Sequence, residues 1–226
     1  FTAGFDQQSV HDERDQARRI AASVGADHEE VSFGEDDFWA LLPQVAASMD
    51  DPVADYAILP TYKLAQSAHK AGLKVILSGE GGDEFFGGYG RYRSAMRWRI
   101  FGGRPMRAKG MFDGLGVLRD ESTGWRSGIA ASEKTEGSMS RTRLQVAQAV
   151  DIADWLPNDL LNKLDRCLMA HGIEGRVPFI DPVLADFAFR LPNSLKVRKR
   201  LGKILLRKWL DKSLSEAEPF ARKKGF

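Results

Sequence analysis

The sequence has one cysteine and four histidines among its 226 residues, and this scarcity excludes several kinds of protein. A single cysteine forms no internal disulfide, so the chain lacks the framework of a small secreted domain and fits a reducing compartment. The histidines, at positions 11, 28, 69 and 171, do not have the spacing of a zinc site. We therefore expect a cytoplasmic protein without disulfides or a histidine-rich metal centre.

Long apolar runs and an excess of charge of one sign are also absent. No apolar run reaches the roughly 20 residues of a transmembrane helix, and no signal-peptide pattern opens the chain. The formal net charge is +2, with 43% apolar and 28% charged residues, which is typical of a globular protein. These values argue against disorder and against a strong polyelectrolyte binder. We expect neither a membrane nor a nucleic acid as partner.

Strand and helix patterns alternate over the first 95 residues, which favours an α/β fold with a parallel sheet. In such sheets ligands bind beyond the carboxyl ends of the strands, and the loop at 78–90 follows one of them. The expected strands are 1–5, 30–33 and 74–77, the last of them buried, and the expected helices are 12–24, 38–49 and 60–71.

Beyond residue 95 the pattern changes. Residues 102–138 are rich in Gly, Ser and Arg and predict an irregular connection. Helical patterns then dominate, and we divide the chain into an α/β core, 1–95, and a mainly helical remainder of the same domain, 96–226. The expected later helices are 144–155, 159–170, 182–191 and 202–214.

The segment LKVILSGEGGDEFFGGYGRY (73–92) combines six glycines with Glu80, Asp83 and Glu84. A glycine turn after a strand forms an anion nest from backbone N–H groups, but carboxylates repel phosphate. Neither the Walker A nor the dinucleotide spacing is present. Two arrangements resolve the conflict: a magnesium ion held by Asp83 bridges to phosphates, or Glu80 is a base for an incoming amine, and both can hold together. A surface turn with solvated acids is the simpler alternative.

Two stretches, 91–109 and 196–208, each contain seven basic residues and no acidic one. Such runs occur on nucleic-acid surfaces, beside nucleotide phosphates and, most often, on solvated faces. Lys203 stands apart because it follows Gly202 at the expected start of a helix. There the helix N-terminus and the ammonium group can act together on a phosphate, although the sequence alone slightly favours an ordinary first-turn lysine.

Other chemically active residue types have structural interpretations. Cys167 falls on the apolar face of its helix and is expected to pack in the core. His171 is expected at the end of the same helix. Asp165 lies on that helix but off its apolar face, with no obvious partner in the sequence. Glu174 and Arg176 are spaced to form an ion pair.

Two motifs together, LSGEGGDEFFGGYGRY (77–92) and KLDRCLMAHGIEGRVPFIDP (163–182), closely resemble the synthetase domain of glutamine-hydrolysing asparagine synthetases. The resemblance covers nearly the whole chain and is weakest over 100–140. Four further segments agree with it in the same order: FTAGF (1–5), DPVADYAILPTY (51–62), LGKILLRKWL (201–210) and PFARKKGF (219–226).

The resemblance implies a partial parallel sheet of the adenine-nucleotide α-hydrolase type, with 1–95 as part of an ATP-pyrophosphatase core. It implies a ligase that binds Mg-ATP, adenylates the side-chain carboxylate of aspartate, and lets ammonia attack the aspartyl adenylate to give asparagine. A separate N-terminal glutaminase domain supplies that ammonia from glutamine. A homodimer is one assembly that the resemblance allows.

By position, the resemblance also assigns roles to seven residues. Glu80 is the base that takes a proton from the attacking ammonia, and Asp165 is a further catalytic candidate. Asp83 helps to hold Mg²⁺. The nucleotide and its products are expected to contact Ala3 (near the adenine), Ser78 and Gly79 (nucleotide or adenylate) and Lys203 (pyrophosphate).

Two departures from the family pattern matter. The signature Ser-Gly-Gly-x-Asp-Ser, which is expected to precede this chain, appears nowhere in it, and neither does the N-terminal cysteine nucleophile of the glutaminase domain. We therefore expect these 226 residues alone to be inactive, because half the phosphate cradle and one metal ligand are missing. The alternatives are a related adenylating enzyme of the β-lactam-synthetase kind with another carboxylate substrate, a tRNA-modifying ATP-pyrophosphatase, and an idle binding scaffold.

Overall fold

A computed structural model describes residues 1–5, 13–107, 114–116 and 124–221. The chain forms two compact units. Unit 1 comprises 1–79, 157–178 and 206–226, and unit 2 comprises 80–156 and 179–205. His11 and the last five residues of the motif at 219–226 lie outside the described residues. The division at residue 95 into a core and a helical remainder stays a prediction.

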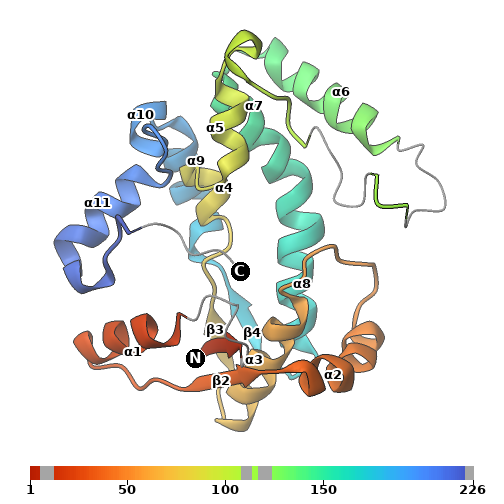
Figure 1. Cartoon of the computed structure of the whole chain (residues 1–226), viewed down its shortest axis with the longest axis vertical. Coiled ribbons are helices and arrows are strands. Elements are labelled where there is room, and N and C mark those ends of the chain that lie inside the picture. Colours follow the sequence, from red (N-terminus) through yellow and green to blue (C-terminus); the bar gives the residue numbers. More distant parts are fainter. Residues whose placement is uncertain (6–12, 108–113, 117–123, 222–226) are drawn as a thin grey trace. The chain divides into compact units, whose positions relative to one another are not determined.

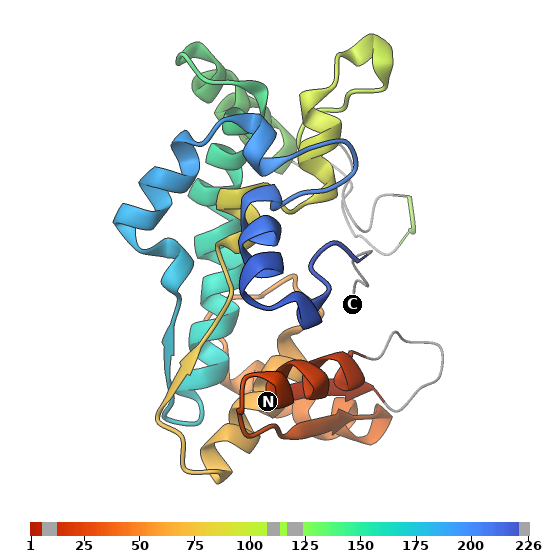
Figure 2. The same ribbon diagram turned by 90° about the vertical axis from the view of Figure 1, so that its left-hand side faces the viewer.

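In unit 1, strand β1 (Thr2–Phe5) pairs in parallel with β2 (Glu30–Phe33), and Ala3 lies opposite Val31. Helix α1 (Arg14–Ser23) connects the two strands and packs against β1 (Figure 2). These elements confirm the strands and the helix expected over the first 33 residues.

The main core of unit 1 lies where α2 (Glu35–Ser48), α3 (Ile58–Lys70) and α8 (Asn162–Met169) meet. Helices α2 and α3 confirm the helices predicted at 38–49 and 60–71, and each begins a few residues earlier than expected. Cys167 is buried there, which confirms its predicted packing role. The buried members of this cluster are Phe33, Leu41, Val45, Leu59, Tyr62 and Cys167.

The second strand pair of unit 1 is β3 (Val75–Leu77) with β4 (Glu174–Arg176), again parallel and side by side in Figure 1. The prediction that β3 is buried is wrong: Leu77 is 70% exposed. Within the described chain β3 has one neighbouring strand, so little covers its faces. The α/β class with parallel pairing is confirmed as two small sheets, and a single sheet of the adenine-nucleotide α-hydrolase type stays a prediction.

A continuous helical run replaces the two helices expected between residues 144 and 170. It consists of α7 (Arg143–Val150), a π-helix (Asp151–Leu161) and α8. Pro157 lies inside the π-helix. Proline lacks an N–H group and clashes with the preceding turn of an α-helix, and the wider π-turn accommodates it without ending the run.

In unit 2, α6 (Trp125–Ser138) packs beside α7, as Figure 1 shows. It lies inside the stretch predicted to be irregular, so that prediction is wrong here. None of its residues is buried, so it has no apolar stripe from which a helix is predicted. Helix α5 (Gly90–Met96) packs on another part of α7, and Tyr92 and Leu144 are buried between them.

The remaining elements are short, apart from the helices α9 (Pro182–Arg190) and α11 (Ile204–Ser213). Asp181 caps α9 by accepting hydrogen bonds from the N–H groups of Val183 and Leu184. No helix among the described residues is long and apolar enough to cross a membrane. These elements are α4 (Gly82–Phe86), α9 (Pro182–Arg190), α10 (Asn193–Lys196), α11 (Ile204–Ser213) and the 3₁₀ turns Arg99–Phe101, Pro178–Ile180 and Ser215–Ala217.

Candidate functional site

Four of the predicted site residues belong to unit 1. Ser78 directly follows β3, and its N–H donates to the carbonyl of Arg176 on β4 over 2.8 Å, which extends the strand pairing by one residue. Gly79 has open space around it, since an added Cβ meets nothing within 4 Å. Ala3 lies in the middle of β1. Asp165 is exposed on α8, away from the buried face of the helix, as predicted.

The other three, Glu80, Asp83 and Lys203, belong to unit 2. There the glycine segment forms the five-residue helix α4, which begins after Gly81 (φ 83°) and ends before Gly87 (φ 74°). Both glycines have left-handed backbones, which strain other residues. The glycines therefore set the two ends of a very short helix that carries Asp83.

Asp83 and Lys203, which the sequence places far apart, form an ion pair: Lys203 Nζ lies 2.9 Å from Asp83 Oδ2. Gly88 lies directly against this pair. A Cβ at Gly88 would stand 1.5 Å from Asp83 Oδ1 and 2.6 Å from Lys203 Cε. Gly202 is equally tight, with its added Cβ 2.2 Å from the carbonyl oxygen of Gly87. The two glycines let the loop and the lysine segment approach each other.

The backbone of Lys203 is also unusual. Its φ is 53°, a left-handed conformation that is uncommon outside glycine and clusters at functional sites. Its N–H donates to the carbonyl of Phe86 over 3.1 Å, and α11 begins at the next residue. The prediction that Lys203 stands at the start of a helix is confirmed.

The three carboxylates of the glycine loop have different environments. Glu84 is buried and accepts a 2.6 Å hydrogen bond from the hydroxyl of Tyr89. Burial raises the pKa of Glu84 above its ordinary value and also raises the pKa of Tyr89. Asp83 pairs with Lys203, and Glu80 is half-buried. Glu84 is therefore part of the packed interior rather than a solvated acid. In the sequence, the one indication of this is Tyr89, which follows Glu84 by five residues.

Part of the first basic stretch has a structural role in unit 2. Arg91 and Arg107 hold the fully buried carboxylate of Asp151 between them, with N–O distances of 2.9 and 3.1 Å. The Arg91 guanidinium also lies 3.8 Å from the centre of the Tyr89 ring. The pattern of basic residues did not reveal this buried partner, because Asp151 is distant in the sequence.

Other members of the same stretch line a cavity of about 550 Å³ in unit 2. Trp98 is part of its lining and stacks with Arg143, whose guanidinium is 4.2 Å from the indole centre. Glu133 accepts a hydrogen bond from the N–H of Met106. The basic side chains lining the cavity are Arg97, Arg104, Arg141 and Arg143.

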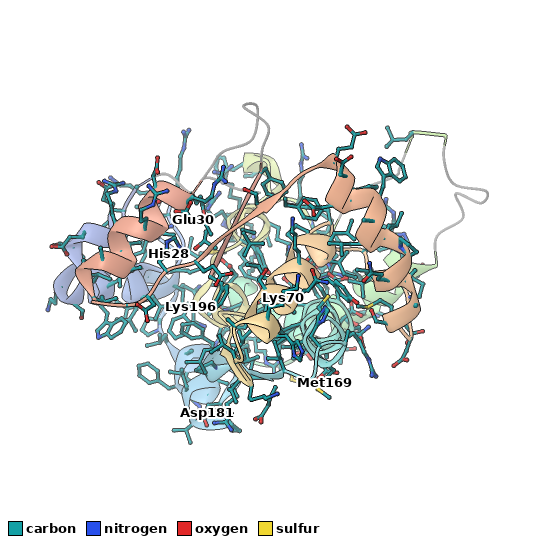
Figure 3. The ribbon with its side chains drawn as sticks, turned by 90° about the horizontal axis from the view of Figure 1, so that it is seen from below. His28, Glu30, Lys70, Met169, Asp181 and Lys196 are labelled. Atoms are coloured by element: carbon teal, nitrogen blue, oxygen red, sulfur yellow. The ribbon has the colours of Figure 1, made fainter. Side chains whose placement is uncertain are left out.

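The histidines that the structure describes have packing or polar roles. His28 reaches the Thr2 hydroxyl over 3.0 Å and lies 3.8 Å from Glu30. Figure 3 labels His28 and Glu30, which lie close together in that view. His171 follows α8, as predicted, and stacks edge-on with Tyr62, with ring centres 4.5 Å apart. Burial lowers the pKa of His171. Within the described ranges no three His, Cys, Asp or Glu side chains gather as metal ligands.

The expected pair between Glu174 and Arg176 is confirmed in β4, with Arg176 Nε 2.9 Å from Glu174 Oε1. Both side chains are well exposed, so the pair contributes little stability.

Comparisons with known proteins identify the family of the chain. The family model described as asparagine synthase matches residues 1–226. Glutamine-hydrolysing asparagine synthetase 1 of Bacillus subtilis is 31% identical over 264 aligned residues, covering 100% of this chain and 42% of that protein. A putative asparagine synthetase of Mycobacterium tuberculosis is 32% identical, covering 93% of this chain and 38% of that protein. Amidase chry2 of Gibberella zeae is 26% identical, covering 88% and 37%.

The chain thus spans about 42% of the length of the bacterial relative that it matches throughout. One assignment follows from three observations: the glycine loop around the Asp83–Lys203 pair, the six motifs in order and the match along all 226 residues. The chain belongs to the asparagine synthase family.

Proposed function

We propose that this chain is part of a ligase that uses ATP to convert aspartate to asparagine. The observation that carries the proposal is the contact between Asp83 and Lys203 against Gly88 within the glycine segment typical of the family. The Asp83 carboxylate on the glycine turn and the Lys203 ammonium group beside it suit a ligand that brings both phosphate oxygens and a metal ion.

The residues of unit 2 fit a magnesium ion that arrives with a phosphate ligand. Magnesium usually takes one or two carboxylates and completes its coordination with waters and phosphate oxygens, so a single aspartate is sufficient. Asp83 would be that ligand. The bound ion offsets charge on the phosphates and on the departing pyrophosphate.

In the proposed reaction, a carboxylate oxygen of aspartate attacks the α-phosphorus of ATP, and the bond to the β-phosphate oxygen breaks. Lys203 binds the released pyrophosphate through its ammonium group. Ammonia then attacks the acyl carbon, the carbon–oxygen bond to AMP breaks, and Glu80 accepts a proton from the nitrogen. Ala3, Ser78 and Gly79 are the proposed nucleotide contacts, and Asp165 is a second catalytic candidate.

The two bacterial synthetases are named as glutamine-hydrolysing and are more than twice as long as the matched region. We therefore propose that a glutaminase domain elsewhere in the intact protein supplies the ammonia. A cytoplasmic location and a homodimer belong to the same proposal.

The test uses the longest natural chain that contains this segment. Pyrophosphate release from Mg-ATP is measured with ammonium, with and without aspartate. Release that requires aspartate, with asparagine as product, supports the proposal. Because one relative is named an amidase, other carboxylic acids are tested as well. Release with one of them and not with aspartate would change the substrate, and no release with any acid would indicate an idle scaffold.

A further inference from the structure

Helix α4 is too short to satisfy its own carbonyl groups. The last four carbonyls of any helix lack partners within it, and α4 has only five residues. Two of its four, those of Asp83 and Phe86, accept backbone hydrogen bonds from the N–H groups of Gly88 (2.8 Å) and Lys203 (3.1 Å). The other two, those of Glu84 and Phe85, need donors from elsewhere.

The side chain of Gln148 on α7 supplies both. Its amide nitrogen Nε2 donates to the carbonyl of Glu84 over 2.5 Å and to that of Phe85 over 2.8 Å. Gln148 is completely buried, so an apolar side chain of similar size in its place would leave the two carbonyl groups without these donors. One amide group therefore holds the C-terminal half of the helix that carries Asp83.

Lys196 on α10 fixes the orientation of that amide. Its ammonium group donates to Gln148 Oε1 over 2.9 Å and to the carbonyl of Phe189 over 2.8 Å. Since an ammonium group only donates, it selects the amide orientation in which Nε2 faces α4. Lys196 is fully buried, which is rare for lysine and costly without hydrogen-bond partners.

The same part of α10 touches the glycine loop directly. A Cβ added at Gly87 would lie 2.9 Å from Val197 Cγ2 and 3.3 Å from Lys196 Cβ. Lys196 therefore supports the C-terminal half of α4 indirectly, through Gln148, and Lys203 supports it directly, through its own N–H group.

We propose that Gln148 and Lys196 are positioning residues, which hold α4 so that Asp83 and Lys203 keep the geometry that the ligase reaction needs. The inference rests on the proposed function. Gln148 donates to backbone carbonyl groups of α4, and Lys196 donates to Gln148, so both act on the pair through the backbone of the loop.

The test compares Gln148→Met with Leu144→Val in the longest natural chain. Both positions are fully buried on α7, but Leu144 packs on the Tyr92 cluster and makes no hydrogen bond to α4. Leu144→Val therefore controls for a general loss of stability. Gln148→Glu is the second glutamine variant. It keeps an acceptor for Lys196 and removes the donors.

Two measurements are made. In pyrophosphate release, both Gln148 variants are expected to lower kcat by about 10- to 100-fold, with KM for aspartate changed less than about twofold, because small displacements of positioned groups cost that much. In hydrogen exchange, the amides of Gly88 and Lys203 are expected to exchange faster than in the unmodified protein. Leu144→Val is expected to change neither. Unchanged exchange at both amides, or the same kcat as Leu144→Val at equal unfolding temperature, would overturn the proposal.

The exchange measurement does not depend on catalysis. If the unmodified protein releases no pyrophosphate with any acid, the proposed function fails, and exchange at Gly88 and Lys203 alone decides whether Gln148 holds the loop. Lys196→Met is expected to give the same pattern as Gln148→Met. The double variant with Gln148→Met and Lys196→Met should change kcat and the exchange rates little more than either single variant, because the two side chains act in one network.

Discussion

The ammonium nitrogen of Lys203 lies 2.9 Å from a carboxylate oxygen of Asp83, and Gly88 leaves no room for a side chain beside them. The resemblance assigns these two residues to different ligands, pyrophosphate for Lys203 and a metal ion for Asp83. In the free protein their contact lets each neutralise the charge of the other. If the proposed roles hold, the pair would link the binding of phosphate to the binding of the metal ion.

Lys203→Met and Asp83→Asn are expected to lower pyrophosphate release by about 100-fold or more, because each removes a charge that acts on the transferred group. Stability is expected to change by less than about 1 kcal/mol, since the two side chains are 30% and 21% exposed and partly solvated pairs contribute little. Steady-state kinetics and urea unfolding check the two expectations. A variant that retains full activity would remove its residue from the proposed site.

Gly88→Ala is expected to separate Asp83 from Lys203, because the new Cβ would overlap the carboxylate at 1.5 Å. We expect a loss of activity similar to that of Asp83→Asn. Gly128→Ala in α6 is the control, since its Cβ meets nothing within 4 Å, and there alanine should stabilise the helix by up to about 1 kcal/mol. Equal activity of the two alanine variants would show that the loop tolerates displacement of the pair.

Asp151→Asn is expected to destabilise the protein by about 2–3 kcal/mol, because Arg91 and Arg107 then lose the full charge of their buried partner. Asp154→Asn is the matched control. Within the described residues Asp154 pairs with Arg107 only, and it is 54% exposed, so its loss should cost less than about 1 kcal/mol. Urea unfolding of the two variants gives the comparison, and similar losses for both would contradict the distinction between a buried and a solvated pair.

The stability of the protein should depend on pH through Lys196. Burial lowers the pKa of Lys196 from 10.5 to about 8. Between these values the folded state binds fewer protons than the unfolded state, so this group makes stability rise with pH. Below pH 8 both states are protonated, and the penalty for burying the charge is fully present.

The measurement is the free energy of unfolding of the unmodified protein and of Lys196→Met at several pH values from 7.5 to 10.5. The difference between the two should move in favour of the unmodified protein by up to about 3 kcal/mol across this range, since one pKa unit corresponds to about 1.4 kcal/mol. Other lysines and tyrosines titrate in both proteins and cancel. A constant difference would mean that Lys196 is not buried as a cation.

Much of the fold follows from local patterns. The strands at the start of the chain, the helices α1 to α3 and the core position of Cys167 all agree with periodicity and glycine placement. Three features do not. β4 reads Glu-Gly-Arg and has no apolar residue to mark a strand, none of the residues of α6 is fully buried, and Pro157 lies inside a π-helix that continues the helical run. In each case backbone pairing or geometry, rather than side-chain pattern, decides the structure.

The same limit applies to the site. The glycine loop and Lys203 are evident as separate motifs, and their resemblance to the family suggests what they bind. The contact between Asp83 and Lys203, the burial of Glu84 and the support from Gln148 depend on packing between distant segments. Gln148 in particular is one of two glutamines on α7, and nothing in its sequence neighbours indicates that it donates to α4.

The most direct test of the proposed ligase is pyrophosphate release by the longest natural chain with Mg-ATP, ammonium and aspartate, compared between the unmodified protein and Glu80→Gln. If Glu80 is the base for ammonia, the variant should still form the aspartyl adenylate and exchange labelled pyrophosphate into ATP, while its rate of asparagine formation falls by about 100-fold or more. Unchanged asparagine formation by Glu80→Gln, or no release that depends on aspartate in the unmodified protein, would contradict the proposal.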